Sequence, residues 1–211
     1  MLHPRTQLGY GMVNGEPLFL DLNSDSYFAL DQKDRECFLA HRSGATGYTG
    51  EPECEDLACA TRASPPPIAG SVLNLPEVPA SPLLIAALWR ALRLARRDLA
   101  RVPLADLVEP FLAAPEEVST RPDAQCITAA HRIARARTFV PQARHCLTDS
   151  LAIMRLLAAQ RAPAMLVFGA KLDPFAAHCW VQSGTMLLND HVDTIRRFTP
   201  VLTVPTCSAT R

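Results

Sequence analysis

The sequence predicts an α+β protein, in which a small region of a β-hairpin and helices precedes a larger region of helices and antiparallel strands. Three observations predict this class. Residues 10–30 have a strand-like pattern, residues 82–160 space apolar side chains as helices do, and residues 164–188 return to short strand-like runs. We therefore expect a first domain over residues 1–76 and a second over residues 80–211.

The first domain is expected to contain a hairpin followed by two helices. Residues 18–22 (Leu-Phe-Leu-Asp-Leu) and 27–30 (Tyr-Phe-Ala-Leu) are strand-like runs, and the polar residues 23–26 between them suit a turn. Asp31 is the expected N-cap of a helix that reaches about His41, and residues 55–62 indicate a second, short helix.

The second domain is expected to place four helices before its strands. Ser81 caps the first helix and Pro82 occupies its first turn, a position that proline favours. The predicted helices span residues 82–101, 104–113, 123–138 and 146–160, and the predicted strands span residues 164–168, 178–182 and 185–188. Ser183-Gly184 suits a tight hairpin turn between the last two strands.

Charge and cysteine content exclude several classes of function. Lys and Arg number 21, as do Asp and Glu, so the chain has no net charge that would favour nucleic acid or a membrane surface. The N-terminus lacks the apolar core of a signal peptide, and no apolar run is long enough to span a bilayer. Seven cysteines at irregular spacings indicate free thiols in the cytoplasm, and no pattern completes a zinc site.

Three residues in the second domain form a candidate nucleophile, base and orienting acid. Cys146 begins a predicted helix, where the helix dipole and unpaired N–H groups favour the thiolate. His178 begins a predicted strand, and Asp190 follows the next strand, so a tight hairpin brings them to the same end of the sheet. Asp190 would then accept Nδ1–H of His178 and hold the other ring nitrogen toward the thiol.

Neighbouring residues offer alternatives to parts of this set. His145 precedes Cys146 but would point away from it on a helix, whereas His191 and Asp193 would replace Asp190 if the hairpin register shifted. Cys179 is expected on the opposite side of the strand from His178, in the core. An oxyanion donor is expected from the backbone N–H of Cys146 or the side-chain amide of Gln142.

Four sequence blocks resemble the lasso-peptide leader peptidases, the transglutaminase-like B proteins of lasso-peptide biosynthesis. The blocks are Cys146-Leu-Thr-Asp-Ser-Leu-Ala152, Met165-Leu-Val-Phe-Gly169, Pro174-Phe-Ala-Ala-His-Cys-Trp-Val181 and Leu187-Leu-Asn-Asp190. The resemblance implies a transglutaminase/papain-like domain whose helix-borne nucleophile packs against an antiparallel sheet. It also implies that Cys146, His178 and Asp190 form the catalytic triad. Cys179 stands where that family often has Ala.

The first domain resembles the precursor-recognition domain of ribosomal peptide pathways. Residues 18–22 together with residues 27–31 (Tyr-Phe-Ala-Leu-Asp) carry this resemblance, which implies a small winged helix-turn-helix. Such a domain binds the leader of a precursor peptide as an added strand, which we expect against the sheet around Phe19, Tyr27 and Phe28.

The resemblance as a whole implies a peptidase that releases a leader through a thioester intermediate and works with an ATP-dependent macrolactam synthetase. The chain has no phosphate loop, so we expect it to bind no cofactor itself and any ATP to bind the synthetase. Two alternatives stay open. An acyltransferase or transglutaminase would use the same triad, and a leader-binding scaffold would carry the triad without using it.

Overall fold

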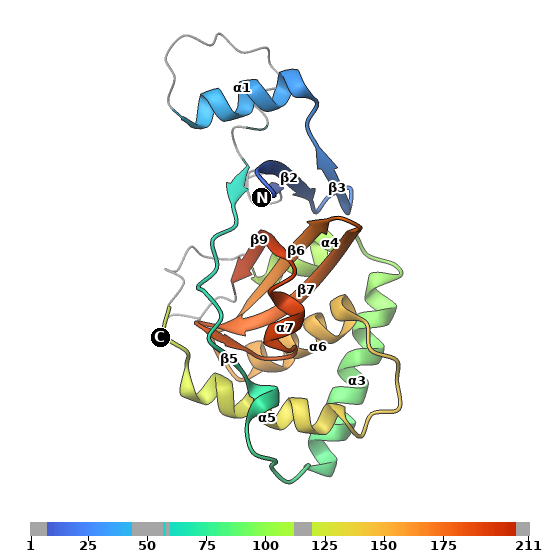
Figure 1. Cartoon of the computed structure of the whole chain (residues 1–211). Coiled ribbons are helices and arrows are strands. Elements are labelled where there is room, and N and C mark those ends of the chain that lie inside the picture. Colours follow the sequence, from blue (N-terminus) through green and yellow to red (C-terminus); the bar gives the residue numbers. More distant parts are fainter. Residues whose placement is uncertain (1–7, 44–56, 58–59, 112–119, 206–211) are drawn as a thin grey trace.

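The computed structural model of the chain describes residues 8–43, 57, 60–111 and 120–205. Figure 1 shows the N-terminal strands and α1 at one end of the molecule and the C-terminal sheet with its helices at the other. The α+β class predicted from the sequence is confirmed.

The N-terminal sheet is an antiparallel meander with one short parallel strand added. Its elements are β1 (Leu8–Val13), β2 (Glu16–Asp21), β3 (Ser26–Ala29), α1 (Gln32–Arg42) and β4 (Thr61–Arg62). The strand order is β3-β2-β1-β4, so β3 lies at one end of the sheet. Asp31 caps α1 as predicted, because its carboxylate accepts the Asp34 N–H at 2.9 Å.

One face of this sheet packs on α1 through aromatic rings. Phe19 is fully buried, and its ring centroid lies 5.1 Å from that of Phe38 on α1 and 5.2 Å from that of Phe28 on β3. Tyr10 completes the cluster, 5.0 Å from Phe38. Edge-to-face and offset contacts of this kind stabilise beyond the area that they bury, so α1 is fixed on the sheet.

The C-terminal sheet has five strands in the order β5-β8-β7-β6-β9. They are β5 (Gly70–Ser71), β6 (Met165–Leu172), β7 (Phe175–Ser183), β8 (Met186–Leu187) and β9 (Thr199–Pro205). The helical elements are η2 (Val72–Asn74), α3 (Pro82–Leu99), α4 (Leu104–Val108), η3 (Glu109–Phe111), α5 (Ala124–Arg137), α6 (Cys146–Ala159) and α7 (Val192–Ile195).

Different helices pack on the two faces of the C-terminal sheet. Val181 and Leu166 belong to the large core that α3, α5 and α6 form with the sheet, whereas Trp180 and Val167 belong to a smaller cluster with Ile195 of α7. Burying one leucine-sized side chain contributes roughly 1.5–3 kcal/mol. The helix side of the sheet therefore supplies most of the stabilisation and holds α6 against β7.

The two sheets meet at β1 and β9, where glycines allow close approach. A Cβ atom on Gly11 would lie 2.0 Å from the Pro200 carbonyl oxygen, and one on Gly9 would lie 2.6 Å from the Val201 carbonyl oxygen. Leucines of β2 join the same core as β9. The predicted domain boundary between residues 76 and 80 stays a prediction, and β5, just before it, pairs with β8 of the C-terminal sheet.

Most predicted helices and strands have the expected positions, with several differences. The predicted helix over residues 55–62 lies mainly outside the described residues, and its last two residues form β4 instead, because they pair with β1. The strand β9 was not predicted; it contains Pro200 and Pro205, which it tolerates as an edge strand. The helix α7 was also not predicted.

One cysteine departs from the prediction of free thiols. Cys37 on α1 is disulfide-bonded, so the prediction of free thiols is wrong at this position, because sequence spacing does not reveal which cysteines a fold brings together. The winged helix-turn-helix stays a prediction. Among the described residues, no helix combines the length and apolar character needed to cross a membrane.

Candidate active site

Cys146 lies at the first residue of α6, as the sequence predicts. His145 is the N-cap and contributes no side-chain hydrogen bond to the helix end, so N–H groups of the first turn stay available to a ligand. The thiol is partly exposed and borders the large core. The positive end of the helix dipole therefore acts on a sulfur that solvent and substrate can reach.

His178 and Asp190 lie side by side at the end of the β7–β8 hairpin. Nε2 of His178 is 2.6 Å from Oδ2 of Asp190, and both side chains are about four-fifths buried. The sequence-based expectation that Nδ1 faces the carboxylate is wrong: the ring presents Nε2 to Asp190, which leaves Nδ1 for the thiol. Register alone places the two residues together but does not fix the rotation of the ring.

The pKa of Cys146 is lowered, whereas that of His178 is raised. A hydrogen bond from the Cys179 thiol, with smaller contributions from His178 and the Cys179 N–H, lowers the pKa of Cys146 to about 4 despite its burial. The hydrogen bond to Asp190, followed by that to Cys146, raises the pKa of His178 to about 9. At neutral pH the pair is therefore a thiolate and an imidazolium, the reactive form of a nucleophilic cysteine.

Cys179 is buried as predicted, yet it also contacts Cys146. Its thiol hydrogen-bonds to Cys146, and this contact together with burial raises the pKa of Cys179 well above its ordinary value. Cys179 therefore stays protonated and donates to the thiolate. Ser150 and Asn189 support it: the Cys179 sulfur lies 3.8 Å from Ser150 Oγ, which accepts from Asn189 Nδ2 at 2.9 Å.

Asp190 is held by hydrogen bonds on both its carboxylate and its carbonyl. Burial acts to raise the pKa of Asp190, but hydrogen bonds from His178, from the His191 N–H at 2.7 Å and from Thr194 outweigh it, so its pKa is lowered. The Ser71 hydroxyl donates to the Asp190 carbonyl at 2.6 Å. Asp190 thus stays ionised and is tied to β5 and α7.

A buried ion pair between Arg137 and Asp149 holds the loop that precedes Cys146. Nε of Arg137 donates to Oδ1 of Asp149, while Nη1 and Nη2 donate to the carbonyls of Val140 at 3.2 Å and Gln142 at 3.0 Å. The other oxygen of Asp149 accepts the His145 N–H at 2.9 Å. One arginine and one aspartate therefore fix both ends of residues 140–145.

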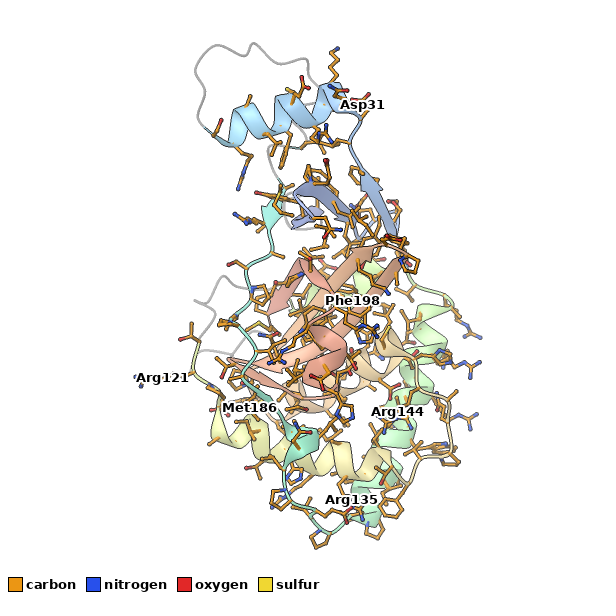
Figure 2. All side chains as sticks on the ribbon, in the orientation of Figure 1. Asp31, Arg121, Arg135, Arg144, Met186 and Phe198 are labelled. Carbon is orange, nitrogen blue, oxygen red and sulfur yellow. The ribbon has the colours of Figure 1, made fainter. Side chains whose placement is uncertain are left out.

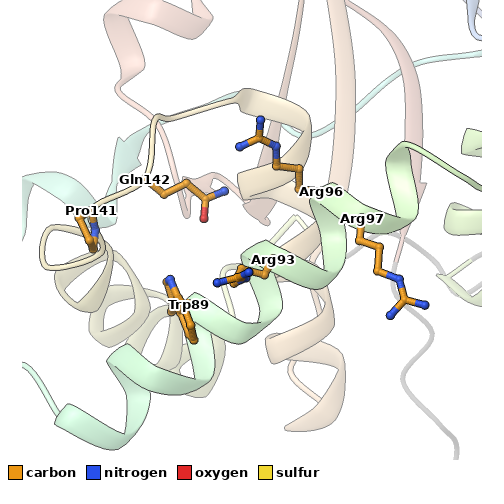
Figure 3. Close-up of a pocket in the computed structure, with 6 residues that line it drawn as sticks. All are labelled: Trp89, Arg93, Arg96, Arg97, Pro141 and Gln142. Atoms are coloured by element: carbon orange, nitrogen blue, oxygen red, sulfur yellow. The ribbon is translucent and has the colours of Figure 1, made fainter.

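These contacts narrow the choice of oxyanion donor. The N–H of His145 is already used by Asp149, whereas that of Cys146 lies at the helix start. The side chain of Gln142 lines a different pocket, with Trp89 on α3, and Figure 3 shows it facing that residue. The expectation of a Gln142 side-chain donor is therefore not supported by its position, and the Cys146 N–H is the donor that the geometry favours.

A cavity of about 440 Å³ opens onto Cys146, His178 and Asp190. Its apolar wall consists of Leu73 and Ile153, along with Ala134, and its polar wall includes Arg144, Asn189 and His191. Figure 2 labels Arg144 and also Phe198, whose ring centroid lies 5.1 Å from that of His178 and restricts the ring. Among the described residues, no cluster of histidine, cysteine and acidic side chains is suited to a metal ion.

The alternative site residues lie in less suitable positions. His145 is exposed at the N-cap, and His191 is exposed beside Asp190. Asp193 is 95% exposed and contacts Arg196 at 3.7 Å rather than His178.

The residues expected around the leader differ in accessibility. Phe19 is fully buried and cannot contact a leader directly, while Tyr27 and Phe28 are partly exposed on β3. The ring of Tyr27 lies 5.8 Å from that of Phe175 at the tip of the β6–β7 hairpin. The end strand of the N-terminal sheet is therefore in contact with the sheet that carries His178.

The sequence did not reveal Arg137, Asp149 and Cys179 as parts of the site. Asp149 carries a weak signal, because an acid in the first turn of a helix that starts with a nucleophile suggests capping. Arg137 carries none, since its position near the end of α5 resembles that of any solvated arginine.

Comparison with known proteins agrees with this geometry. A model of the transglutaminase-like superfamily matches residues 88–203, more than half of the chain, and this range includes Cys146, His178 and Asp190. Over 45 residues the chain is 42% identical to microcin J25-processing protein McjB of Escherichia coli. That stretch covers 21% of this chain and 22% of that protein, so it spans about a fifth of the relative. No solved structure matches the chain.

Proposed function

The chain belongs to the transglutaminase-like superfamily, and on this basis we propose that it is a cysteine peptidase that cleaves the leader from a ribosomally made lasso-peptide precursor. The observation that carries the proposal is the arrangement of Cys146 at the start of α6 beside His178, whose ring lies 2.6 Å from Asp190, an environment that lowers the pKa of Cys146 and raises that of His178. The similarity to a microcin-processing protein supports the peptide class, although it covers a short stretch.

The first half of the reaction forms a thioester. The Cys146 thiolate attacks the carbonyl carbon that links leader to core, and the resulting oxyanion is held by the Cys146 N–H. Nδ1 of His178 gives its proton to the departing amine of the core, and the carbon–nitrogen bond breaks. The leader is then joined to Cys146, and the core peptide leaves with a free N-terminus.

The second half of the reaction hydrolyses the thioester. Neutral His178 takes a proton from water, which attacks the thioester carbon and releases the leader as a carboxylic acid. The thiolate and the imidazolium are restored. Asp190 keeps Nε2 of His178 occupied throughout, so that Nδ1 moves each proton.

Leader binding is proposed to occur on β3 of the N-terminal sheet. This strand ends the sheet among the described residues and so offers main-chain groups for an added strand. Its residue Tyr27 contacts Phe175 on β7, the strand that carries His178. A leader bound along β3 would thus arrive beside the catalytic sheet. A macrolactam synthetase that consumes the freed amine is the proposed partner, and any ATP would bind to it.

Mass spectrometry of a processing reaction tests this function. The protein is incubated with the precursor peptide, with and without the synthetase, and the masses of released leader and core are measured. We expect release by the wild type, none by Cys146→Ala, and near-normal release by Cys126→Ala, which removes a buried free thiol on α5 instead.

The other outcomes separate the alternatives. Equal release by wild type and Cys146→Ala would refute the assignment of the nucleophile. A leader joined to an added amine in place of a free acid would indicate an acyltransferase. Tight binding of precursor without any release, with or without the synthetase, would indicate a scaffold.

A further inference from the structure

A second pocket, of about 370 Å³, lies between α3 and the loop that precedes Cys146. Its α3 side is formed by Trp89, Arg93, Arg96 and Arg97, and its loop side by Pro141 and Gln142. Figure 3 shows Trp89, Arg93 and Arg96 on the side of the helix that faces the loop, while the Arg97 side chain points away from it. The spacing of these residues, three or four apart, places them on one side of the helix.

The arginines of this pocket have no acidic partner in the part of the chain that the structure describes. Among the described residues, the arginines that pair with acids are elsewhere, and Arg93, Arg96 and Arg97 are not among them. The one acid on α3, Asp98, accepts from Arg155 at 2.8 Å and is therefore occupied. In a chain of zero net charge, this part of α3 is a local concentration of positive charge.

The pocket is arranged for a planar anion. The guanidinium of Arg93 lies 4.8 Å from the centre of the Trp89 ring, which limits its motion and leaves its N–H edges free. Arg93 and Arg96 approach the same hollow although like charges repel, an arrangement that an anion between them would stabilise. A guanidinium group matches a carboxylate through two parallel hydrogen bonds.

We propose that this pocket docks an acidic peptide segment, with glutamate or aspartate carboxylates on Arg93 and Arg96 and an apolar neighbour on Trp89. Trp89 is 44% exposed and offers the apolar contact. The lining consists of side chains on the outside of a helix, without the glycine-rich turn of backbone N–H groups that binds nucleotide phosphates. A peptide rather than a nucleotide therefore fits the site.

Hydrogen bonds of Arg137 connect this pocket to the helix that begins at Cys146. The Gln142 carbonyl accepts from Arg137 at 3.0 Å, and Arg137 also binds Asp149 in the first turns of α6. An acidic segment docked here would lie against the outer side of the loop whose end carries the thiol. The proposal does not require that Cys146 be a nucleophile, so it is tested by binding alone.

Fluorescence anisotropy of a labelled oligo-glutamate peptide tests the proposal on the full-length protein. We expect binding at low ionic strength that Arg93→Glu/Arg96→Glu weakens at least about tenfold, since two charge-assisted contacts are lost and reversed. The matched control is Arg90→Glu/Arg101→Glu. It makes the same change in net charge with exposed arginines from the same helix and its end that do not line the pocket, and it should weaken binding less than about twofold.

Further readouts make the test decisive. An oligo-glutamine peptide should not bind, and the change in tryptophan fluorescence on adding unlabelled oligo-glutamate should disappear in Trp89→Phe. Equal loss of binding in the two double variants, equal binding of oligo-glutamine, or no binding of oligo-glutamate would overturn the proposal. So would an oligothymidine that binds more tightly than oligo-glutamate and loses its binding in Arg93→Glu/Arg96→Glu.

Discussion

The two pockets on either side of the loop 140–145 differ in how their charges are balanced. In the pocket that contains Cys146, His178 pairs with Asp190 and Arg137 pairs with Asp149. In the pocket on α3, Arg93 and Arg96 face a hollow without an acid. The first pocket pairs the charges of His178 and Arg137 internally, whereas Arg93 and Arg96 form no ion pair among the described residues.

This difference indicates different tasks. Internal pairs hold reactive groups at fixed distances and set their protonation before a substrate arrives, which is the condition for catalysis by preorganised charge. Unpaired charges at a surface do no chemistry but attract and orient a ligand of opposite charge. The loop between the pockets is held by Arg137, so it is a fixed wall for both.

The largest expected effect comes from breaking the His178 pairing. His178→Gln should lower the rate of leader release by at least about a thousandfold, because the proposed general acid and base is removed. The pKa of Cys146 should also rise, since His178 contributes to lowering it. Release rates from single-turnover reactions, followed by mass spectrometry, measure the first effect. A loss of less than tenfold would contradict the role of His178.

Breaking the buried Arg137–Asp149 pair should reduce both stability and turnover. Asp149→Asn leaves a buried guanidinium uncompensated and should lower the free energy of unfolding by about 3–5 kcal/mol. The matched control is Asp98→Asn, which breaks a pair about one-third exposed and should cost about 1 kcal/mol or less. Urea denaturation of both variants gives these values.

A double variant distinguishes loop positioning from stability. Arg137→Met/Asp149→Leu removes both charges and should recover much of the stability, because buried pairs are replaced by apolar side chains at little cost. We still expect this variant to turn over at least about tenfold more slowly than the wild type, because the loop 140–145 loses its hydrogen bonds. Both rates are normalised to the amount of titratable Cys146 thiol. Full recovery of turnover with stability would show that the pair is merely structural.

A smaller effect is expected from Cys179→Ala, which removes a neutral donor and no charge. Because the Cys179 thiol is the largest cause of the lowered pKa of Cys146, its removal should move that pKa from about 4 toward the ordinary value. The pH at which alkylation of Cys146 is half-maximal reports this change. Leu147→Ala is a suitable control for a small cavity beside the site, and an unchanged midpoint in Cys179→Ala would refute the contact.

The smallest expected effect concerns salt. Raising the ionic strength from about 0.05 to 0.3 M should weaken oligo-glutamate binding on α3 severalfold, because exposed charges are screened. The same change should leave the alkylation midpoint of Cys146 nearly constant, since its hydrogen-bonded partners are partly or fully buried. Equal salt dependence of both quantities would remove the distinction between the pockets.

The sequence predicted those features that local rules determine. Asp31 and Ser81 cap helices where the pattern places caps, and the short β7–β8 turn fixes the register that brings Asp190 to His178. A hairpin leaves little freedom once the turn is known. For this reason the placement of the candidate triad could be predicted, although the orientation of the His178 ring could not.

Features that depend on packing between distant segments were not predicted. The contact of Cys179 with Cys146 depends on how α6 lies across β7, and the pairing of Arg137 with Asp149 depends on how α5 ends beside α6. The α3 pocket likewise requires residues 141–142 to approach a helix some 50 residues earlier in the chain. Periodicity describes each element but not the position of one element against another.

The rate of alkylation of Cys146 by iodoacetamide as a function of pH tests the central claim most directly, because it needs no precursor peptide. Peptide mapping by mass spectrometry separates Cys146 from the other cysteines. The account predicts a rate that rises with a midpoint near pH 4 and stays high through neutral pH, where the thiolate is paired with protonated His178. A midpoint near 9, the ordinary value of a cysteine, would contradict the claim that Cys146 is an activated nucleophile.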